Sequence, residues 1–119
     1  MLSKKYRLKN PLAFIATYKQ NNAISDRNIC IYFGKKITEE NRNVRIAFVV
    51  SKKIHKRAVV RNRIKRLMRE SIRLAIKDNK LPSLNKYLSV ICVAKSGAIG
   101  SDFKTINNSL TALITKKTK

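Results

Sequence analysis

The most regular alternation of apolar and polar positions in the chain lies between residues 57 and 77. Apolar or small residues recur there every three or four positions, as the buried face of an α-helix requires. These residues are Val60, Ile64, Leu67, Met68, Ser71, Ile72 and Ala75. At about 100° per residue the opposite face is polar and basic. It carries Asn62, Arg66, Arg69, Arg73 and Lys77, and its flanks carry Arg61, Arg63 and Lys65. The pattern predicts a long helix with one side in a core and the other side strongly basic.

Three other segments have the pattern of β-strands. Residues 27–33 (RNICIYF) alternate, so that the apolar positions 29, 31 and 33 share one face and Tyr32 lies on the other. Residues 44–51 alternate in the same way, with a bulky face that includes Phe48 and a slimmer one that includes Ala47. Residues 87–94 (YLSVICVA) have the β-branched content of a buried strand. A charged turn between the first two strands favours a hairpin that pairs them.

Two further helices are indicated by their ends. Asn10 followed by Pro11 predicts a helix start, because asparagine caps well and proline costs nothing at the first helical position. This helix should stop near residue 21. After a loop that contains two glycines, Ser101 can cap a last helix. The basic residues 115–119 beyond that helix are expected to be frayed.

Together these elements predict a single α+β domain that spans residues 1–119, a two-layer sandwich of helices against a small mixed sheet. The predicted order is helix, strand, strand, basic helix, strand, helix, with one further short strand allowed before the basic helix. Neither an internal repeat nor a second domain is indicated.

The charge of the chain points to a polyanionic partner. There are 28 basic and 6 acidic residues, a formal net charge of +22, spread over the whole sequence. A merely solvated helix face would mix signs, yet Glu70 is the only acid between Arg57 and Lys77. Nucleic acid is the leading partner. An anionic membrane surface comes second, because the chain has no long apolar run and the apolar helix face has no Trp or Phe.

The sequence contains none of the usual signatures of an enzyme. The acids form no pair suited to acid–base catalysis, and His55, the only histidine, has no evident carboxylate or nucleophile partner. Cys30 and Cys92 lie far apart and without histidine neighbours, so they are expected to be small buried thiols rather than zinc ligands. The N-terminus lacks the apolar segment of a secretory signal, and we expect a cytoplasmic protein. The polypeptide alone should catalyse nothing and should bind neither a metal nor a cofactor.

Two binding surfaces are predicted. The first is the basic helix with its approach segment, whose cations are Lys52, Lys53, Lys56 and Arg57. Arginine side chains bind phosphate oxygens through two hydrogen bonds at once. The second consists of three aromatic residues that could border a groove floored by Ala47 and Val49, if the first helix lies on that side of the sheet; they are Phe14, Tyr18 and Tyr32. Rings beside cations bind single-stranded RNA by stacking on its bases. The alternative is that Phe14 and Tyr18 are ordinary core residues.

The block VSKKIHKRAVVRNRIKRLMRE, residues 50–70, resembles the signature of the protein subunit of bacterial ribonuclease P. In that family a lysine pair ends a strand, and a helix with an RNR motif follows. RLKN with downstream Phe14 and Tyr18 agrees with it, as does a short strand followed by a C-terminal helix. The resemblance extends over nearly the whole chain.

The resemblance implies a specific function. A large RNA would carry the active site and its Mg²⁺ ions, and the holoenzyme, an endoribonuclease, would remove the 5′ leader from precursor tRNA. The partners would be the ribonuclease P RNA and precursor tRNA, with no obligate protein partner. Phe14, Tyr18 and Tyr32 would bind the leader. The catalytic RNA would contact Lys52, Lys53, Lys56, Arg57, Arg61, Asn62, Arg63, Lys65, Arg66, Arg69 and Arg73. The family also joins two strands across this helix by a left-handed crossover.

Two other classes of protein stay open from the sequence. A structural ribosomal-type protein fits the size, charge and fold class equally well, although it needs neither the RNR block nor an aromatic groove. A DNA-binding module is third, because a recognition helix usually presents varied base-reading side chains. The face predicted here is almost uniformly arginine and lysine.

Overall fold

The computed structural model describes residues 6–36, 44–78, 84 and 86–117. The elements in chain order are α1 (Pro11–Lys19), β1 (Ala23–Ser25), β2 (Ile29–Phe33), β3 (Arg45–Val49), α2 (Ala58–Lys77), β4 (Ser89–Ala94), the short 3-10 helix η3 (Ser96–Ala98) and α3 (Phe103–Lys117). The predicted α+β class is confirmed, and each predicted helix and strand is present. Three strands precede α2, which agrees with the predicted order and its one optional strand. The additional strand is β1, which lies between α1 and β2.

The strands form one mixed sheet in the order β1-β2-β4-β3. β2 is antiparallel to both β1 and β4, whereas β3 runs parallel to β4. The predicted hairpin between residues 27–33 and 44–51 is therefore wrong, because β4 lies between these two strands. β4 is apolar on both faces, and such a strand gains most from a central position that is covered on both sides. The expected turn itself falls mostly on residues 37–43, outside the described residues.

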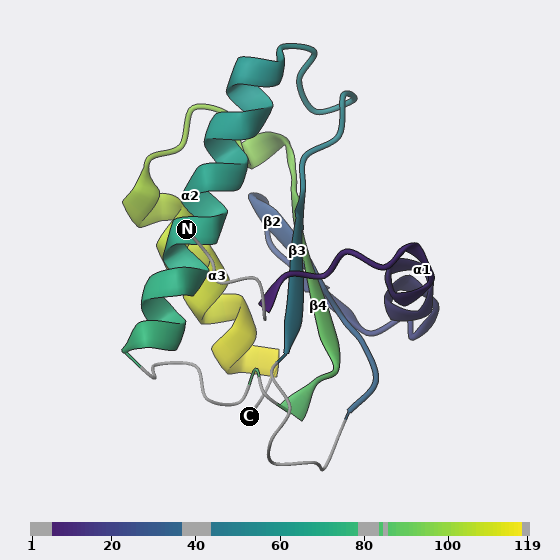
Figure 1. Ribbon diagram of the computed structural model, residues 1–119. Coiled ribbons are helices and arrows are strands. Elements are labelled where there is room, and N and C mark those ends of the chain that lie inside the picture. The colour runs from purple at the N-terminus through teal and green to yellow at the C-terminus, as the bar shows by residue number, and fades with distance from the viewer. Residues whose placement is uncertain (1–5, 37–43, 79–83, 85, 118–119) are drawn as a thin grey trace.

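Helices cover both faces of this sheet. α2 and α3 lie side by side on one face, and α1 crosses the other face alone (Figure 1). The main core lies under α2 and α3, where Ile31 and Phe33 of β2 are completely buried together with Met68 of α2. The alternation predicted for β2 is confirmed by this burial. A smaller cluster lies under α1, around Ala47 and Ile91.

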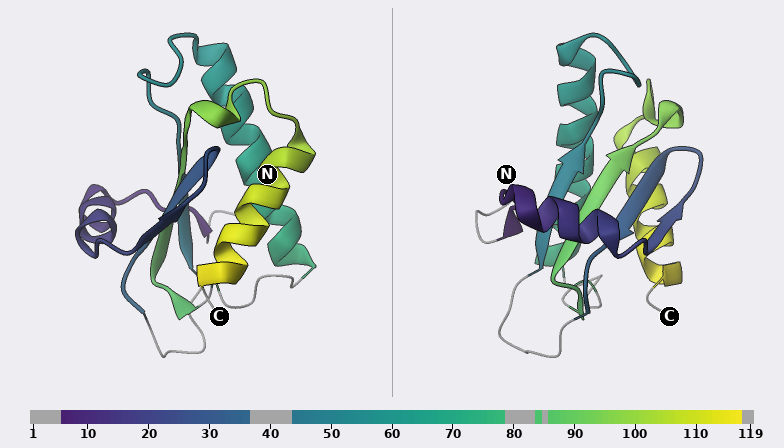
Figure 2. Two further views of the ribbon diagram at one scale, coloured as in Figure 1. Left: turned by 180° about the vertical axis from the view of Figure 1, so that it is seen from behind. Right: turned by 90° about the vertical axis from the view of Figure 1, so that its right-hand side faces the viewer.

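The connection from β3 through α2 to β4 is left-handed. In the right-hand view of Figure 2, the sheet is seen from the side of α1, with α2 and α3 behind it. β3 and β4 both run upward there, and β4 lies to the right of β3. A right-handed crossover with its helix behind the sheet would place the second strand to the left. Nearly all parallel crossovers are right-handed, so this exception agrees with the expectation drawn from the resemblance.

The helix starts are set by side-chain caps. Asn10 caps α1 as predicted, and its Oδ1 accepts a hydrogen bond from the backbone N–H of Leu12 at 2.9 Å. The predicted cap of α3 was Ser101, but the helix is capped by Asp102, one residue later. Asp102 Oδ1 accepts from the backbone N–H of Thr105 at 2.9 Å, and this bond lowers the pKa of Asp102. Asp102 is as good a cap as serine and has the position that lets Phe103 begin the helix.

The ends of two elements differ slightly from expectation. α1 ends at Lys19, and Asn21 follows with a φ of 50°, a left-handed conformation that asparagine tolerates better than most residues. α3 continues to Lys117, so the segment expected to be frayed is helical for its first three residues. Its last two residues lie outside the described part of the chain.

Candidate nucleic-acid interface

α2 presents a broad basic surface to solvent. Its inner face is anchored by Ile64, Met68 and Ile72, which are completely or almost completely buried. This confirms the buried face predicted from the spacing of apolar residues. The predicted outward residues Asn62 and Arg66 are exposed. Half-buried at the flanks are Arg61, Lys65, Arg69 and Arg73, while Arg63 is exposed.

Two of these arginines already hold partners within the protein. Arg73 donates to both carboxylate oxygens of Glu70, at 3.0 and 2.5 Å. These hydrogen bonds raise the pKa of Arg73 and lower that of Glu70, so both groups stay charged and largely neutralise each other. Arg63 Nη1 donates to the carbonyl oxygen of Ser101 at 3.1 Å, which ties the start of α3 to α2. Of the predicted set, Arg73 is therefore the least available for a phosphate.

Two other arginines face the sheet side of α2. The guanidinium of Arg69 lies over the ring of Phe48, 5.9 Å from its centroid, in the geometry of a cation–π contact. Arg61 Nε is buried and has no hydrogen-bond partner among the described residues. A buried charged donor is costly to leave unsatisfied, so this nitrogen is suited to an acceptor that a ligand would bring.

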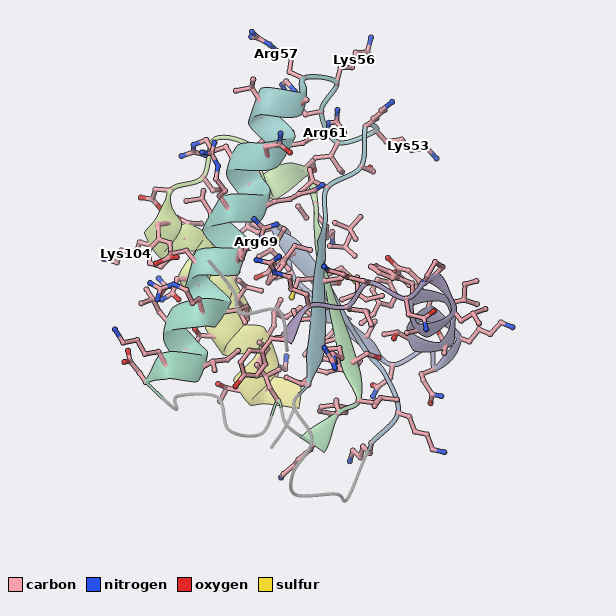
Figure 3. The ribbon with its side chains drawn as sticks, in the orientation of Figure 1. Lys53, Lys56, Arg57, Arg61, Arg69 and Lys104 are labelled. Atoms are coloured by element: carbon pink, nitrogen blue, oxygen red, sulfur yellow. The ribbon has the colours of Figure 1, made fainter. Side chains whose placement is uncertain are left out.

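The approach segment extends the basic surface beyond the start of α2. Lys52, Lys53, Lys56 and Arg57 are all exposed. Figure 3 shows Lys56 and Arg57 projecting from this end of the molecule above Arg61, and Lys53 to the right of Arg61. His55 Nδ1 accepts a hydrogen bond from the backbone N–H of Arg57 at 3.1 Å, so the histidine shapes the turn.

Lys104, at the start of α3, is exposed on the flank of α2 opposite Arg69 (Figure 3). The sequence pattern did not single it out, because α3 comes to lie beside α2 only through the packing of the folded chain, where Arg63 also donates to Ser101.

The three predicted aromatic residues lie together on the other side of the sheet. The rings of Tyr18 on α1 and Tyr32 on β2 meet edge to face, with their centroids 4.8 Å apart. Phe14, Tyr32 and Val49 pack against the small cluster under α1, in which Ile91 of β4 lies between Tyr32 and Ala47. Tyr18 is 39% exposed, and the other two rings are half-buried. We keep the predicted name, the aromatic groove, for these three residues, which have both apolar contacts and ring surface open to solvent.

Both tyrosines of the aromatic groove stay uncharged over the physiological range. Burial, and secondarily Cys30, raises the pKa of Tyr18. The neighbouring Cys30 is the main cause that raises the pKa of Tyr32. Neutral phenols do not repel a phosphate chain. Cys30 and Cys92 are free thiols, and Cys92 is completely buried, whereas Cys30 is only half-buried beside the tyrosines.

A pocket of about 300 Å³ lies at the edge of the sheet, between the two surfaces. We call it the junction pocket; it is lined by Arg7, Leu8, Lys9, Phe14, Ile46, Ala47, Phe48 and Arg69. A second hollow of about 440 Å³, the outer hollow, lies on α2 itself. It is lined by Val59, Asn62, Lys65, Arg66 and Arg69. Arg69 thus borders both.

Two further searches cover only the described part of the chain. Within those residues, no three metal-ligating side chains come together. None of the described helices combines the length and the apolar character that crossing a membrane demands.

Comparison with known proteins identifies the family. A family model described as Ribonuclease P matches residues 2–118. The ribonuclease P protein component of Clostridium kluyveri is 38% identical over 112 residues, which are 93% of this chain and 93% of that protein. The corresponding protein of Rickettsia canadensis is 32% identical over 113 residues, covering 92% and 94%.

Solved structures agree with this. The RNase P protein of Staphylococcus aureus superposes with a TM-score of 0.74 at 27% identity, covering 93% of this chain and 94% of that one. That of Thermotoga maritima shares the fold, with a TM-score of 0.71 at 22% identity and coverages of 92% and 96%. Family membership favours the ribonuclease P interpretation of the chain over that of a ribosomal-type protein. The chain belongs to the bacterial ribonuclease P protein family and is the protein subunit of that endoribonuclease, which takes part in 5′ processing of precursor tRNA.

Proposed function

We propose that α2 docks this subunit on the ribonuclease P RNA while the aromatic groove holds the single-stranded 5′ leader of precursor tRNA. The observation that supports this division best is the placement of two chemically different surfaces on opposite sides of one sheet. One surface is arginine-rich and the other aromatic, and Arg69 borders the edge between them. Such a protein can touch a folded RNA and a single strand at the same time.

The docking surface would neutralise phosphates on the catalytic RNA. It comprises the approach segment with Lys52, Lys53, Lys56 and Arg57, and the α2 residues Arg61, Asn62, Arg63, Lys65, Arg66, Arg69 and Arg73. Each phosphate that the protein neutralises adds about 0.7 to 0.9 to the slope of log K against log salt concentration. RNA binding should therefore weaken steeply as salt is added, and a flat dependence would contradict this docking.

The aromatic groove would select precursor over mature tRNA. Bases of the leader would stack on Phe14, Tyr18 and Tyr32, whose neutral rings accept any base. Mature tRNA has no leader and would lose these contacts. Mg²⁺ ions held by the RNA would supply the activated water for hydrolysis. The protein contributes binding and orientation of the substrate.

Substitutions on each surface test the division in the reconstituted holoenzyme. Arg63→Ala combined with Arg66→Ala should weaken binding to the catalytic RNA. Tyr32→Ala should reduce the preference for precursor over mature tRNA by about 1–3 kcal/mol, the contribution of one stacked base, and Tyr32→Phe should keep the preference. Lys116→Ala removes one exposed charge from the far end of α3 and serves as the matched control.

The measurements are the affinities for the RNA, for precursor tRNA and for mature tRNA. If Tyr32→Ala lowers binding of precursor and mature tRNA equally, the aromatic groove does not hold the leader. If Lys116→Ala weakens RNA binding as much as the double substitution does, overall charge rather than the α2 surface is responsible.

A further inference from the structure

The start of α2 lacks the usual helix cap. Its N-cap residue is Arg57, which makes no side-chain capping hydrogen bond, and its first turn contains no acid. A Glu or Gln at the third helical position often accepts a hydrogen bond from the N-cap N–H, which has no partner inside the helix. Val60 stands at this position and cannot accept one. His55 accepts the bond instead, from the backbone N–H of Arg57 to its Nδ1 at 3.1 Å, and thus acts as a capping residue from outside the helix.

This hydrogen bond closes a turn that carries cations of the approach segment. The backbone N–H of Ile54 donates to the carbonyl oxygen of Ser51 at 3.1 Å, and the half-buried side chain of Ile54 packs against the main core. These contacts anchor the first half of the segment. The bond from Arg57 to His55 joins the second half to α2, and Lys56 lies inside the loop that it closes. A core side chain and an imidazole thus hold the segment in place.

An imidazole accepts this hydrogen bond without adding a negative charge. A ring nitrogen that accepts carries no proton, so the ring in this geometry is neutral and has its proton on Nε2. Aspartate or glutamate would accept from the same N–H and is favoured at helix starts. Its carboxylate would, however, lie among cations that are proposed to meet phosphates, and it would oppose that attraction. Residues 51–60 contain no acid, so His55 supplies the acceptor and leaves this part of the chain purely basic.

We infer that His55 is a positioning residue, whose Nδ1 hydrogen bond holds the approach segment in the shape that binds the ribonuclease P RNA. The inference rests on the proposed function, in which the cations of this segment belong to the docking surface. They are Lys52, Lys53, Lys56 and Arg57. Figure 3 shows the last three pointing away from one another, so the backbone of the segment sets which phosphates they can reach together. Without the hydrogen bond, the segment must be ordered during binding, and this cost lowers the affinity.

Three substitutions of His55 test the inference with the full chain and the ribonuclease P RNA. His55→Ala removes the acceptor and should weaken RNA binding by roughly 2- to 30-fold, the equivalent of a lost helix cap. His55→Asn should restore the affinity, because an asparagine side chain accepts from the N–H two residues further along. His55→Asp keeps the acceptor but adds a negative charge, so it should melt no lower than the unaltered protein and yet bind the RNA more weakly. At saturating protein, His55→Ala should cleave precursor tRNA with an unchanged kcat, since the bound segment has its native shape.

Two serines provide matched controls. Ser51→Ala changes an exposed side chain of the same turn and keeps the backbone carbonyl that Ile54 contacts, so it should alter neither stability nor RNA binding. Ser71→Ala removes the 2.6 Å hydrogen bond from Ser71 to Asn107 Oδ1 between α2 and α3. It should lower the melting temperature without weakening RNA binding. This control separates the shape of the approach segment from the overall stability of the protein.

The outcomes separate the inference from the proposed function. If His55→Asn binds the RNA as weakly as His55→Ala, or if Ser71→Ala weakens binding as much, His55 does not position the segment. A lower kcat at saturating protein with unchanged RNA affinity would also contradict the inference. If the His55 variants bind normally while Arg63→Ala with Arg66→Ala binds weakly, the inference fails and the docking surface stands. If all of these variants bind normally, the proposed docking fails as well.

Discussion

Replacing Thr17 by valine tests what holds α1 against the sheet. In this helix, all of which is described, Thr17 is the one buried residue. Its Oγ1 donates to the carbonyl oxygen of Ala13 at 2.7 Å and makes a second hydrogen bond to Ser89 Oγ on the central strand β4. Threonine has a single hydroxyl proton, which the bond to Ala13 uses. Ser89 must therefore be the donor in the second bond.

Because of this assignment, the loss of the Thr17 hydroxyl and the loss of the Ser89 hydroxyl should lower stability by different amounts. Thr17 and Ser89 are only 1% and 5% exposed, so water does not readily replace a lost partner. Thr17→Val leaves the Ser89 hydroxyl buried without its acceptor and should lower the free energy of unfolding by about 1–3 kcal/mol. Ser89→Ala leaves the Thr17 proton satisfied by Ala13 and should cost only about 0.5–1.5 kcal/mol. The double substitution should cost less than the sum of the two.

Urea unfolding at a fixed phosphate concentration measures these differences, with the m-value as a check that unfolding remains two-state. Ser71→Ala is the matched control, because Ser71 is also a buried serine and donates to Asn107 Oδ1 at 2.6 Å between α2 and α3. Both Thr17→Val and Ser71→Ala should lower stability. Only Thr17→Val should also lower the preference for precursor tRNA, since α1 carries Phe14.

Two results would refute the reasoning. If the two single losses add up fully in the double variant, the hydroxyls are not coupled. If Ser89→Ala costs more than Thr17→Val, the direction of the hydrogen bond is reversed.

Two glycines and two cysteines give further predictions. A Cβ at Gly97 would overlap with the backbone of Arg27, whereas at Gly100 it would meet nothing within 4 Å, although φ is +75°. Gly97→Ala should therefore lower the melting temperature more than Gly100→Ala, and the reverse order in thermal melts would disprove the close approach. Burial raises the pKa of Cys92 to about 12, from an ordinary value of 9.0. Between about pH 9 and 12 the unfolded thiol loses its proton and the folded one keeps it, so stability should fall as pH rises through this range. Cys92→Ala should remove that part of the pH dependence, and native-state alkylation should label Cys30 before Cys92.

The sequence predicted those parts of the fold that depend on local periodicity. The buried face of α2 is correct because one side of a helix repeats every three or four residues, whatever it packs against. The pairing of strands was not predictable in the same way. Alternation identifies residues 27–33 and 44–51 as strands, but it does not say that β4, from much later in the chain, lies between them. β1, with three residues, is too short for alternation to be informative.

In the candidate site too, local features were predictable from the sequence, and features that combine distant segments were not. The basic face of α2 and the spacing of Phe14 and Tyr18 are local features of single helices. The junction pocket combines an N-terminal segment, a strand edge and one arginine of α2, which come together only in the folded chain. Phe48 was predicted as part of a core face. Its ring also makes a cation–π contact with Arg69, which depends on the packing of α2 against β3.

The central place of β4 has a consequence for how the chain is made. The ribosome delivers β2 and β3 well before residues 89–94, and until then the two strands lack the neighbour that they share. Their inner edges stay open for that time, and open edges invite pairing with other chains. The nascent segment is also strongly basic, and like charges keep such chains apart. We therefore expect the net charge that favours RNA binding in the finished protein to hinder aggregation of the unfinished one as well.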